Sequence, residues 1–135
     1  MTAPPLIRVL ESALYADDLR KAEDFYAGVL GLELDSKQAE RHLFFKCGPT
    51  MLLVFNPEQT LKQAGPVPAH GTTGPAHLAF AVESDDDIAA WRSRLEAADV
   101  EIEADLDWPG GGRSLYFRDP AGNSLELTTP RIWGL

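Results

Sequence analysis

Three side chains able to ligate a metal ion are spread along the sequence: Glu11, His77 and Glu126. Each lies in a short segment where large aliphatic residues alternate with small or polar ones, and each belongs to the small or polar face. Imidazole and carboxylate groups together bind divalent Mn, Fe(II), Zn, Ni or Co. The long spacings match no short motif, so the residues also fit two ordinary strand-edge carboxylates and one hydrogen-bonded interior histidine.

Aromatic side chains form a second group of candidates. Tyr15 shares a predicted strand face with Glu11 and could donate a proton near a metal, or it could be a core tyrosine. Phe55 and Trp108 could line a substrate wall, although packing in the core explains them as well.

Two basic side chains complete the set of substrate-binding candidates. His70 lies in a long loop, where it could act as an acid or base on a substrate or be solvated. Arg113 follows three glycines, and it could clamp a substrate carboxylate or pair with one of the many acidic residues. His42 begins a predicted strand and is expected to face solvent.

The elements that would position these residues occur in a repeated order. Apolar periodicity, helix caps and turn residues predict strand, helix, strand, strand, strand, and then the same order again. The predicted strands are 6–16, 32–36, 41–47 and 51–55 in the first half, and 76–83, 100–103, 114–117 and 124–128 in the second. The predicted helices follow Asp18 and Ser84 as caps.

This duplication predicts an α+β fold in which two βαβββ modules form a curled mixed sheet around a central cleft, with the helices outside. We expect a single domain with module one at 6–56, a connecting loop at 57–74, module two at 75–129 and a tail at 130–135. The loop contains several prolines and glycines, and loops of this length are usually functional or mobile.

Composition restricts the partners. The chain has 135 residues, 12 basic against 21 acidic, and a net charge of −9. An acidic chain without a basic cluster is a poor partner for nucleic acid or for an anionic membrane surface. One cysteine allows no internal disulfide, and neither a signal peptide nor an apolar run of roughly 18 residues is present, so we expect a cytoplasmic protein.

Three segments resemble the vicinal oxygen chelate superfamily, which includes glyoxalase I, extradiol dioxygenases and bleomycin-resistance proteins. They are 18–32 (DLRKAEDFYAGVLGL), 74–80 (GPAHLAF) and 116–127 (YFRDPAGNSLEL), and the Asp-Pro-x-Gly-Asn-x-x-Glu pattern in the last is the most specific. The resemblance covers nearly the whole chain. It implies the duplicated fold with a metal cleft.

The resemblance also implies a ligand set. The family's ligands on the first strand, the second-module strand and the last strand correspond to Glu11, His77 and Glu126. Glyoxalase I adds a carboxylate at a position that falls on Leu52 or Leu53, so that ligand is missing. Glu11 also departs from the histidine of extradiol dioxygenases.

The resemblance therefore predicts a divalent-metal-dependent enzyme whose metal chelates oxygens of a small organic substrate. The expected catalytic groups are Glu11 and Glu126, together with Tyr15 from its shared strand face with Glu11. Lyase or isomerase chemistry is preferred because the first ligand is glutamate, and an extradiol-type dioxygenase is an alternative. Another alternative is a metal-free drug-binding or resistance protein, for which the acidic charge would suit a cationic drug. A third is an interaction module without chemistry. We expect a homodimer, with Ile132 and Trp133 at its interface.

Overall fold

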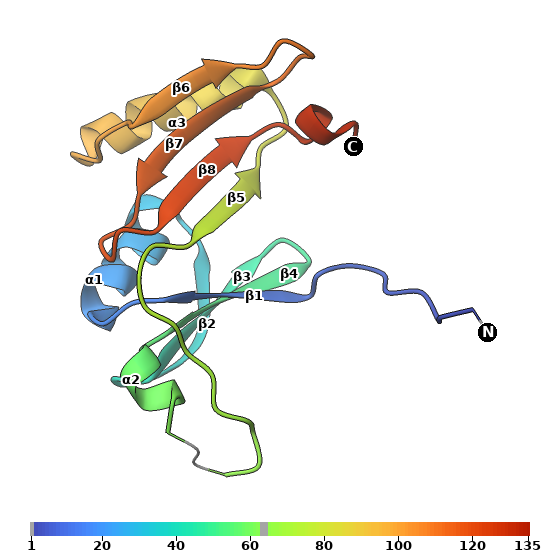
Figure 1. The fold of residues 1–135 in the computed structure, drawn as a ribbon. Helices are drawn as coiled ribbons and strands as arrows, with labels where there is room; N and C mark the ends of the chain where they lie inside the picture. Colours follow the sequence, from blue (N-terminus) through green and yellow to red (C-terminus); the bar gives the residue numbers. More distant parts are fainter. Residues whose placement is uncertain (1, 63–64) are drawn as a thin grey trace.

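The structure, a computed structural model, describes residues 2–62 and 65–135. Besides α-helices and strands (Figure 1), the chain has a π-helical segment, η1, and a 3-10 helix, η2. In chain order the elements are β1 (Glu11–Tyr15), α1 (Leu19–Glu23), η1 (Asp24–Val29), β2 (Glu33–Gln38), β3 (His42–Cys47), β4 (Thr50–Phe55), α2 (Pro57–Thr60), β5 (His77–Ala81), α3 (Asp85–Ala97), β6 (Ala104–Asp107), β7 (Arg113–Arg118), β8 (Ser124–Thr128) and η2 (Pro130–Trp133).

The strands form two four-stranded mixed sheets with the same topology, β1-β4-β3-β2 and β5-β8-β7-β6. β1 and β5 run parallel to their neighbours β4 and β8, and the remaining pairs are antiparallel. The predicted α+β class and the duplicated order are confirmed. Within one chain the two sheets stay separate and do not close around a common barrel axis (Figure 1).

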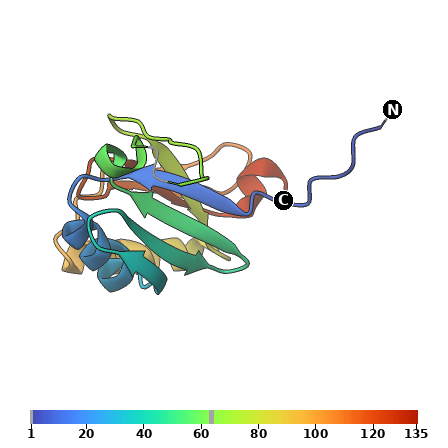
Figure 2. The ribbon, with the colours of Figure 1, turned by 90° about the horizontal axis from the view of Figure 1, so that it is seen from below.

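Two predicted strands differ most from the observed ones, for reasons of pairing. β1 begins at Glu11, which pairs with Met51 near the start of β4. The Met51 N–H also donates to the Leu10 carbonyl, and residues 2–9 lie beyond the end of this pairing. They form an apolar arm that leaves the body of the molecule (Figure 2), with Leu6 97% exposed. The strand predicted at 100–103 lies instead at Ala104–Asp107, where β7 provides its partners.

The first helical segment is a short α-helix that widens into a π-helix. Asp18 caps α1 by accepting a hydrogen bond from the backbone N–H of Lys21, as predicted. The wide turn then buries two consecutive aromatic residues, Phe25 and Tyr26. The segment ends before Gly31, whose φ of 73° requires glycine-like freedom.

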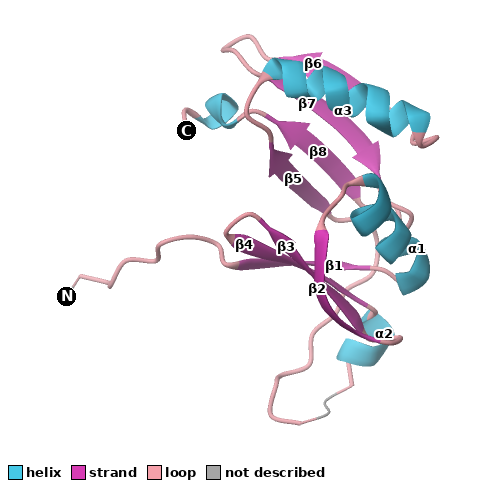
Figure 3. Cartoon of the chain, turned by 180° about the vertical axis from the view of Figure 1, so that it is seen from behind, coloured by secondary structure: helices cyan, strands magenta, loops and turns pink. Residues whose placement is uncertain are grey.

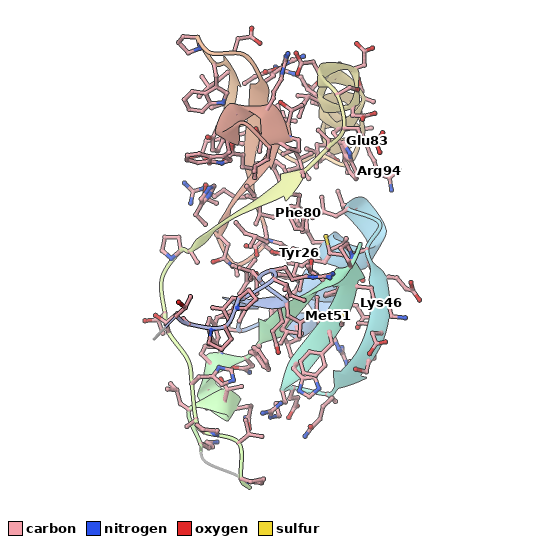
Figure 4. The ribbon with its side chains drawn as sticks, turned by 90° about the vertical axis from the view of Figure 1, so that its right-hand side faces the viewer. Tyr26, Lys46, Met51, Phe80, Glu83 and Arg94 are labelled. Carbon is pink, nitrogen blue, oxygen red and sulfur yellow. The ribbon has the colours of Figure 1, made fainter. Side chains whose placement is uncertain are left out.

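A shared core joins the modules. Buried apolar side chains from both halves belong to one contiguous cluster, which includes Tyr26 and Phe45 from the first and Ile88 and Phe117 from the second. α3 covers the back of the second sheet (Figure 3), and Tyr26 and Phe80 lie between the sheets (Figure 4). The helix side of each sheet therefore faces this core, and the opposite faces are left for function.

The Asp-Pro-Ala-Gly-Asn turn before β8 fastens the modules together. Asp119 accepts hydrogen bonds from the N–H groups of Ala121 and Asn123 and from the hydroxyl of Tyr26 in module one. The Asn123 side chain accepts from the Ala76 N–H and donates to the Tyr15 carbonyl. One turn thus sets the ends of β1, β5 and β8 relative to one another.

Across the two described stretches of the chain, no helix combines the length and the apolar character needed to cross a membrane.

Candidate active site

His77 and Glu126 meet on the face of the second sheet that points away from α3. Nδ1 of His77 lies 3.0 Å from the backbone carbonyl of Ser124. A carbonyl oxygen only accepts, so Nδ1 carries the proton, and in the neutral ring Nε2 presents a lone pair. That lone pair lies 3.3 Å from Oε1 of Glu126, which is also an acceptor. Two lone pairs facing each other need either an added proton or a cation between them.

Glu126 is held in place on its other side. Its Oε2 accepts a 2.6 Å hydrogen bond from the hydroxyl of Ser114, and both residues are buried. The Glu126 side chain is 7% exposed, whereas that of His77 is 53% exposed, so the pair opens to solvent on the histidine side. A buried carboxylate is costly without a positive partner, and in the described part of the chain His77 is its ion-pair partner.

The pair fits a divalent metal ion. Metal–nitrogen and metal–oxygen bonds of about 2.1 Å place two neighbouring ligand atoms about 3.0 Å apart at a right angle and about 3.4 Å apart at a tetrahedral angle. The observed 3.3 Å lies within this range. The backbone hydrogen bond on Nδ1 is the support that metal-binding histidines usually have, since it fixes the tautomer that ligates through Nε2.

Tyr116 adds an acid group beside the pair. It lies opposite Glu126 on β7, and its ring stacks on His77 with centroids 6.3 Å apart. Burial first, and then the negative charge of Glu126, raise the pKa of the Tyr116 phenol. The phenol therefore keeps its proton at neutral pH and can act as a donor.

Glu11 lies in the other sheet, at the exposed start of β1. Among residues 2–62 and 65–135, no three His, Cys, Asp or Glu side chains come close enough to hold a metal ion. One chain thus brings together two of the three predicted ligands, and Glu11 stays apart from them. The register also decides which leucine replaces the fourth ligand: Leu53 pairs with Ala13 as Glu126 pairs with Ala79.

The corresponding face of the first sheet is aromatic. Tyr15 forms a 2.7 Å hydrogen bond with Nδ1 of His70, and the His70 ring meets the Phe55 ring edge-on at 4.6 Å. Three predicted candidates from β1, β4 and the connecting loop are therefore in mutual contact. Burial raises the pKa of the Tyr15 phenol.

His42 differs from the expectation of a solvent-facing residue. Its ring is half-buried and stacks flat on Phe44 at 4.0 Å, and it receives a hydrogen-bond contact from the Arg41 guanidinium at 2.6 Å. Burial and the charge of Arg41 both lower the pKa of His42, so it is neutral at pH 7. The two faces thus differ in kind, the second being polar and the first aromatic.

Of the two remaining candidates, one reaches the polar face. The indole N–H of Trp108 donates a 2.8 Å hydrogen bond to Ser114, which contacts Glu126. Arg113 instead forms a bidentate pair with Asp105. Arg113 thus has a carboxylate partner within the chain, and together with Arg92 it lowers the pKa of Asp105 to about 2.

Ser114 and Tyr116 are site residues that were not predicted from the sequence, although a signal was present. Both have the same parity in their strand, so they share one face of β7. Pairing that strand with the last one through the Asp119–Asn123 turn places Ser114 opposite Thr128 and Tyr116 opposite Glu126.

Comparison with known proteins identifies the family of the chain. A family model described as the Glyoxalase/Bleomycin resistance protein/Dioxygenase superfamily matches residues 8–127. A search of curated proteins found no match. The crystal structure of lactoylglutathione lyase from Agrobacterium tumefaciens is 42% identical, with a TM-score of 0.94 over 97% of this chain and 99% of that one.

Two more distant structures share the fold. A glyoxalase/bleomycin resistance protein/dioxygenase from Nocardioides is 24% identical, with a TM-score of 0.74 over 96% of this chain and 85% of its own. A glyoxalase-related enzyme from Fulvimarina pelagi is 23% identical, with a TM-score of 0.74 over 94% and 91%. The family model covers most of the sequence, and the duplicated sheets agree with it: the chain belongs to the Glyoxalase/Bleomycin resistance protein/Dioxygenase superfamily.

Proposed function

We propose that this protein is a divalent-metal-dependent lyase or isomerase that acts on a small organic substrate through its oxygen atoms. The observation that carries the proposal is the buried Glu126 carboxylate facing the lone pair of His77 at 3.3 Å. The similarity to a lactoylglutathione lyase favours lyase chemistry over reaction with dioxygen. When bound, the metal would act as a Lewis acid that stabilises negative charge on a substrate oxygen.

The residues of the chain would hold and protonate the substrate. His77 and Glu126 would hold the metal, and the exposed side of His77 leaves room for substrate oxygens. Tyr116 would donate a hydrogen bond to a substrate oxygen, since its raised pKa keeps the phenol protonated. Tyr15, hydrogen-bonded to His70, would pass a proton between the aromatic face and the substrate.

Glu11 would be the third ligand, supplied by a second copy of the chain. Support for this arrangement comes from its exposure and from its separation, within one chain, from His77 and Glu126. A homodimer with a two-fold axis would supply two such sites, each built from two chains.

Metal content tests the proposal. Protein purified without chelator or histidine tag should contain about one divalent metal per chain by elemental analysis. The isosteric Glu126→Gln and the exposed His77→Ala should lose it, while Glu40→Gln, a matched surface control on the β2–β3 turn, should keep it. Absence of metal in the wild type, with no uptake of added Mn, Fe(II), Zn, Ni or Co, would overturn the proposal.

Mixing two inactive variants tests the origin of Glu11. If the site spans two chains, a dimer of Glu11→Gln with His77→Ala has one site with both wild-type residues. Random pairing then restores about a quarter of the sites. No recovery of metal or of activity on hemithioacetals, 2-oxo acids or catechols would refute a shared site, provided that the chains exchange.

A metal-free binding protein is the second candidate, favoured by one observation. The face around Phe55 carries stacked and edge-on rings, with Arg41 5.8 Å from the Phe55 ring centre. Such a surface can hold a planar apolar molecule without a metal. A chain that takes up no metal but binds aromatic compounds at this face would support this function instead.

A further inference from the structure

The glycine-rich loop 108–112 delivers one side chain, Trp108, to the proposed site. The backbone N–H of Trp108 donates to the carbonyl of Gly112 at 2.9 Å, and the backbone N–H of Gly111 donates back to the carbonyl of Trp108 at 2.9 Å. This closed turn carries the indole of Trp108 over the polar face of the second sheet. There its Nε1–H lies 2.8 Å from the hydroxyl of Ser114.

The turn depends on Gly112. Its φ is +99°, and a Cβ at this position would overlap Cγ2 of Ile132 and lie 3.1 Å from the hydroxyl of Thr129. A larger residue would therefore be both strained and blocked, and the loop would have to move. This close approach explains the glycine at position 112.

The Ser114 hydroxyl has one proton, and its neighbours decide where that proton points. The indole N–H of Trp108 only donates, so it uses one lone pair of Ser114. The hydroxyl of Thr128, 2.9 Å away, can donate to the other lone pair or to the Arg113 carbonyl. Ser114 donates to Oε2 of Glu126 at 2.6 Å, which is the length of a charge-assisted hydrogen bond.

We infer that Trp108 and Ser114 are positioning residues that hold Glu126 so that it binds the metal through one oxygen, Oε1. We call these two consecutive hydrogen bonds, from Trp108 to Ser114 and from Ser114 to Glu126, the relay. The inference rests on the proposed function and deepens it. The relay ties Oε2 to a buried donor and leaves Oε1 facing Nε2 of His77 at 3.3 Å. Partners of metal ligands that act in this way contribute about 10- to 100-fold to metal affinity.

Titration with Co²⁺, followed by its visible absorption, tests the relay. Trp108→Phe removes the indole N–H but keeps an aromatic ring, and we expect about 10-fold weaker binding. Ser114→Ala should weaken it further and change the Co²⁺ bands, because the freed Oε2 can also coordinate. Trp91→Phe is the matched control, since Trp91 lies on α3, on the other side of the same sheet, and should leave both readouts unchanged.

The possible results separate the relay from the proposed function. If wild type and His77→Ala both fail to bind Co²⁺, the proposed function and the relay's role fall together. If wild type binds, His77→Ala does not, and Trp108→Phe matches Trp91→Phe in affinity and bands, the metal site stands and the relay is wrong.

A metal-free measurement examines the hydrogen bonds directly. The three tryptophans give three indole N–H signals in a ¹H–¹⁵N spectrum. Ser114→Ala and Glu126→Gln should each shift the Trp108 signal and leave that of Trp91 in place. An unmoved Trp108 signal in both variants would overturn the relay even if metal binding is confirmed.

Discussion

Replacing Tyr26 with phenylalanine tests whether the modules are joined through the turn before β8. Tyr26 is fully buried, and its hydroxyl donates a 2.6 Å hydrogen bond to Oδ2 of Asp119 in the other module. Tyr26→Phe removes one oxygen atom and keeps the ring that packs in the shared core. The change therefore isolates this bond.

The size of the effect follows from the partners that remain. A hydrogen bond to a charged group contributes about 1.5–3 kcal/mol. Asp119 keeps three N–H donors from Ala121 and Asn123, so its carboxylate is not left without partners. We expect a loss of about 2 kcal/mol in the free energy of unfolding, a fall of roughly 8 °C in melting temperature for a domain of this size.

Urea unfolding, followed by two signals, provides the assay. All three tryptophans, Trp91, Trp108 and Trp133, lie in the second half of the chain, so their fluorescence reports that half. Far-ultraviolet circular dichroism reports both halves. The shared core predicts coincident transitions for wild type and variant.

Two results would refute this reasoning. A loss below about 0.5 kcal/mol would show that the hydroxyl contributes no more than an ordinary surface group. Separate transitions for the two signals in wild type would show that the modules unfold independently, and the single core would then be a wrong description of the stability.

Three further predictions concern other contacts. Asp105→Asn should lower the free energy of unfolding by about 1 kcal/mol at pH 7, because solvent screens part of the interaction with the arginines. Because the Asp105 pKa is lowered to about 2, the difference from wild type in urea unfolding should shrink as pH falls below about 4 and vanish only below about 2. A difference independent of pH would contradict this prediction. Gly112→Ala should lower the melting temperature and release the loop from Ile132, seen as altered Trp fluorescence, whereas an unchanged protein would show that the loop adapts freely. His70→Ala should lower the free energy of unfolding by about 1 kcal/mol, because the hydroxyl of Tyr15 loses its hydrogen-bond partner. An equal loss in Tyr15→Phe, with no additional loss in the double variant, would assign the effect to this hydrogen bond, and additive losses would contradict it.

Local signals were sufficient for the elements with strong alternation and clear turns. The strand at Ser124–Thr128 was predicted with its observed bounds, because a polar-apolar pattern follows a turn that Asp119 and Gly122 make. The start of β1 was not predicted correctly, because it depends on where β4 provides backbone partners. β6 is the four-residue segment Ala-Asp-Leu-Asp, whose alternation is too short to mark a strand by itself, so its place depends on pairing with β7.

The same distinction applies to the site. Face alternation predicted that His77 and Glu126 point to one side of their sheet, and both do. The position of Glu11 relative to them depends on how two sheets are set against each other, which no local pattern encodes. The widening of the first helix into a π-helix was also hidden, because burial of both Phe25 and Tyr26 is a demand of the shared core.

The equivalent registers of the two sheets suggest how such a protein can change its chemistry. Where the second sheet has Glu126 beside Tyr116, the first has Leu53 beside Phe44 at matching positions. A doubled scaffold permits specialisation, since one half can conserve reactive groups while the other accumulates apolar side chains that select the molecule to be transformed. New substrates would then arise by substitutions at apolar positions of the first sheet such as Leu53 and Phe44, without disturbing the ligands His77 and Glu126 on the second.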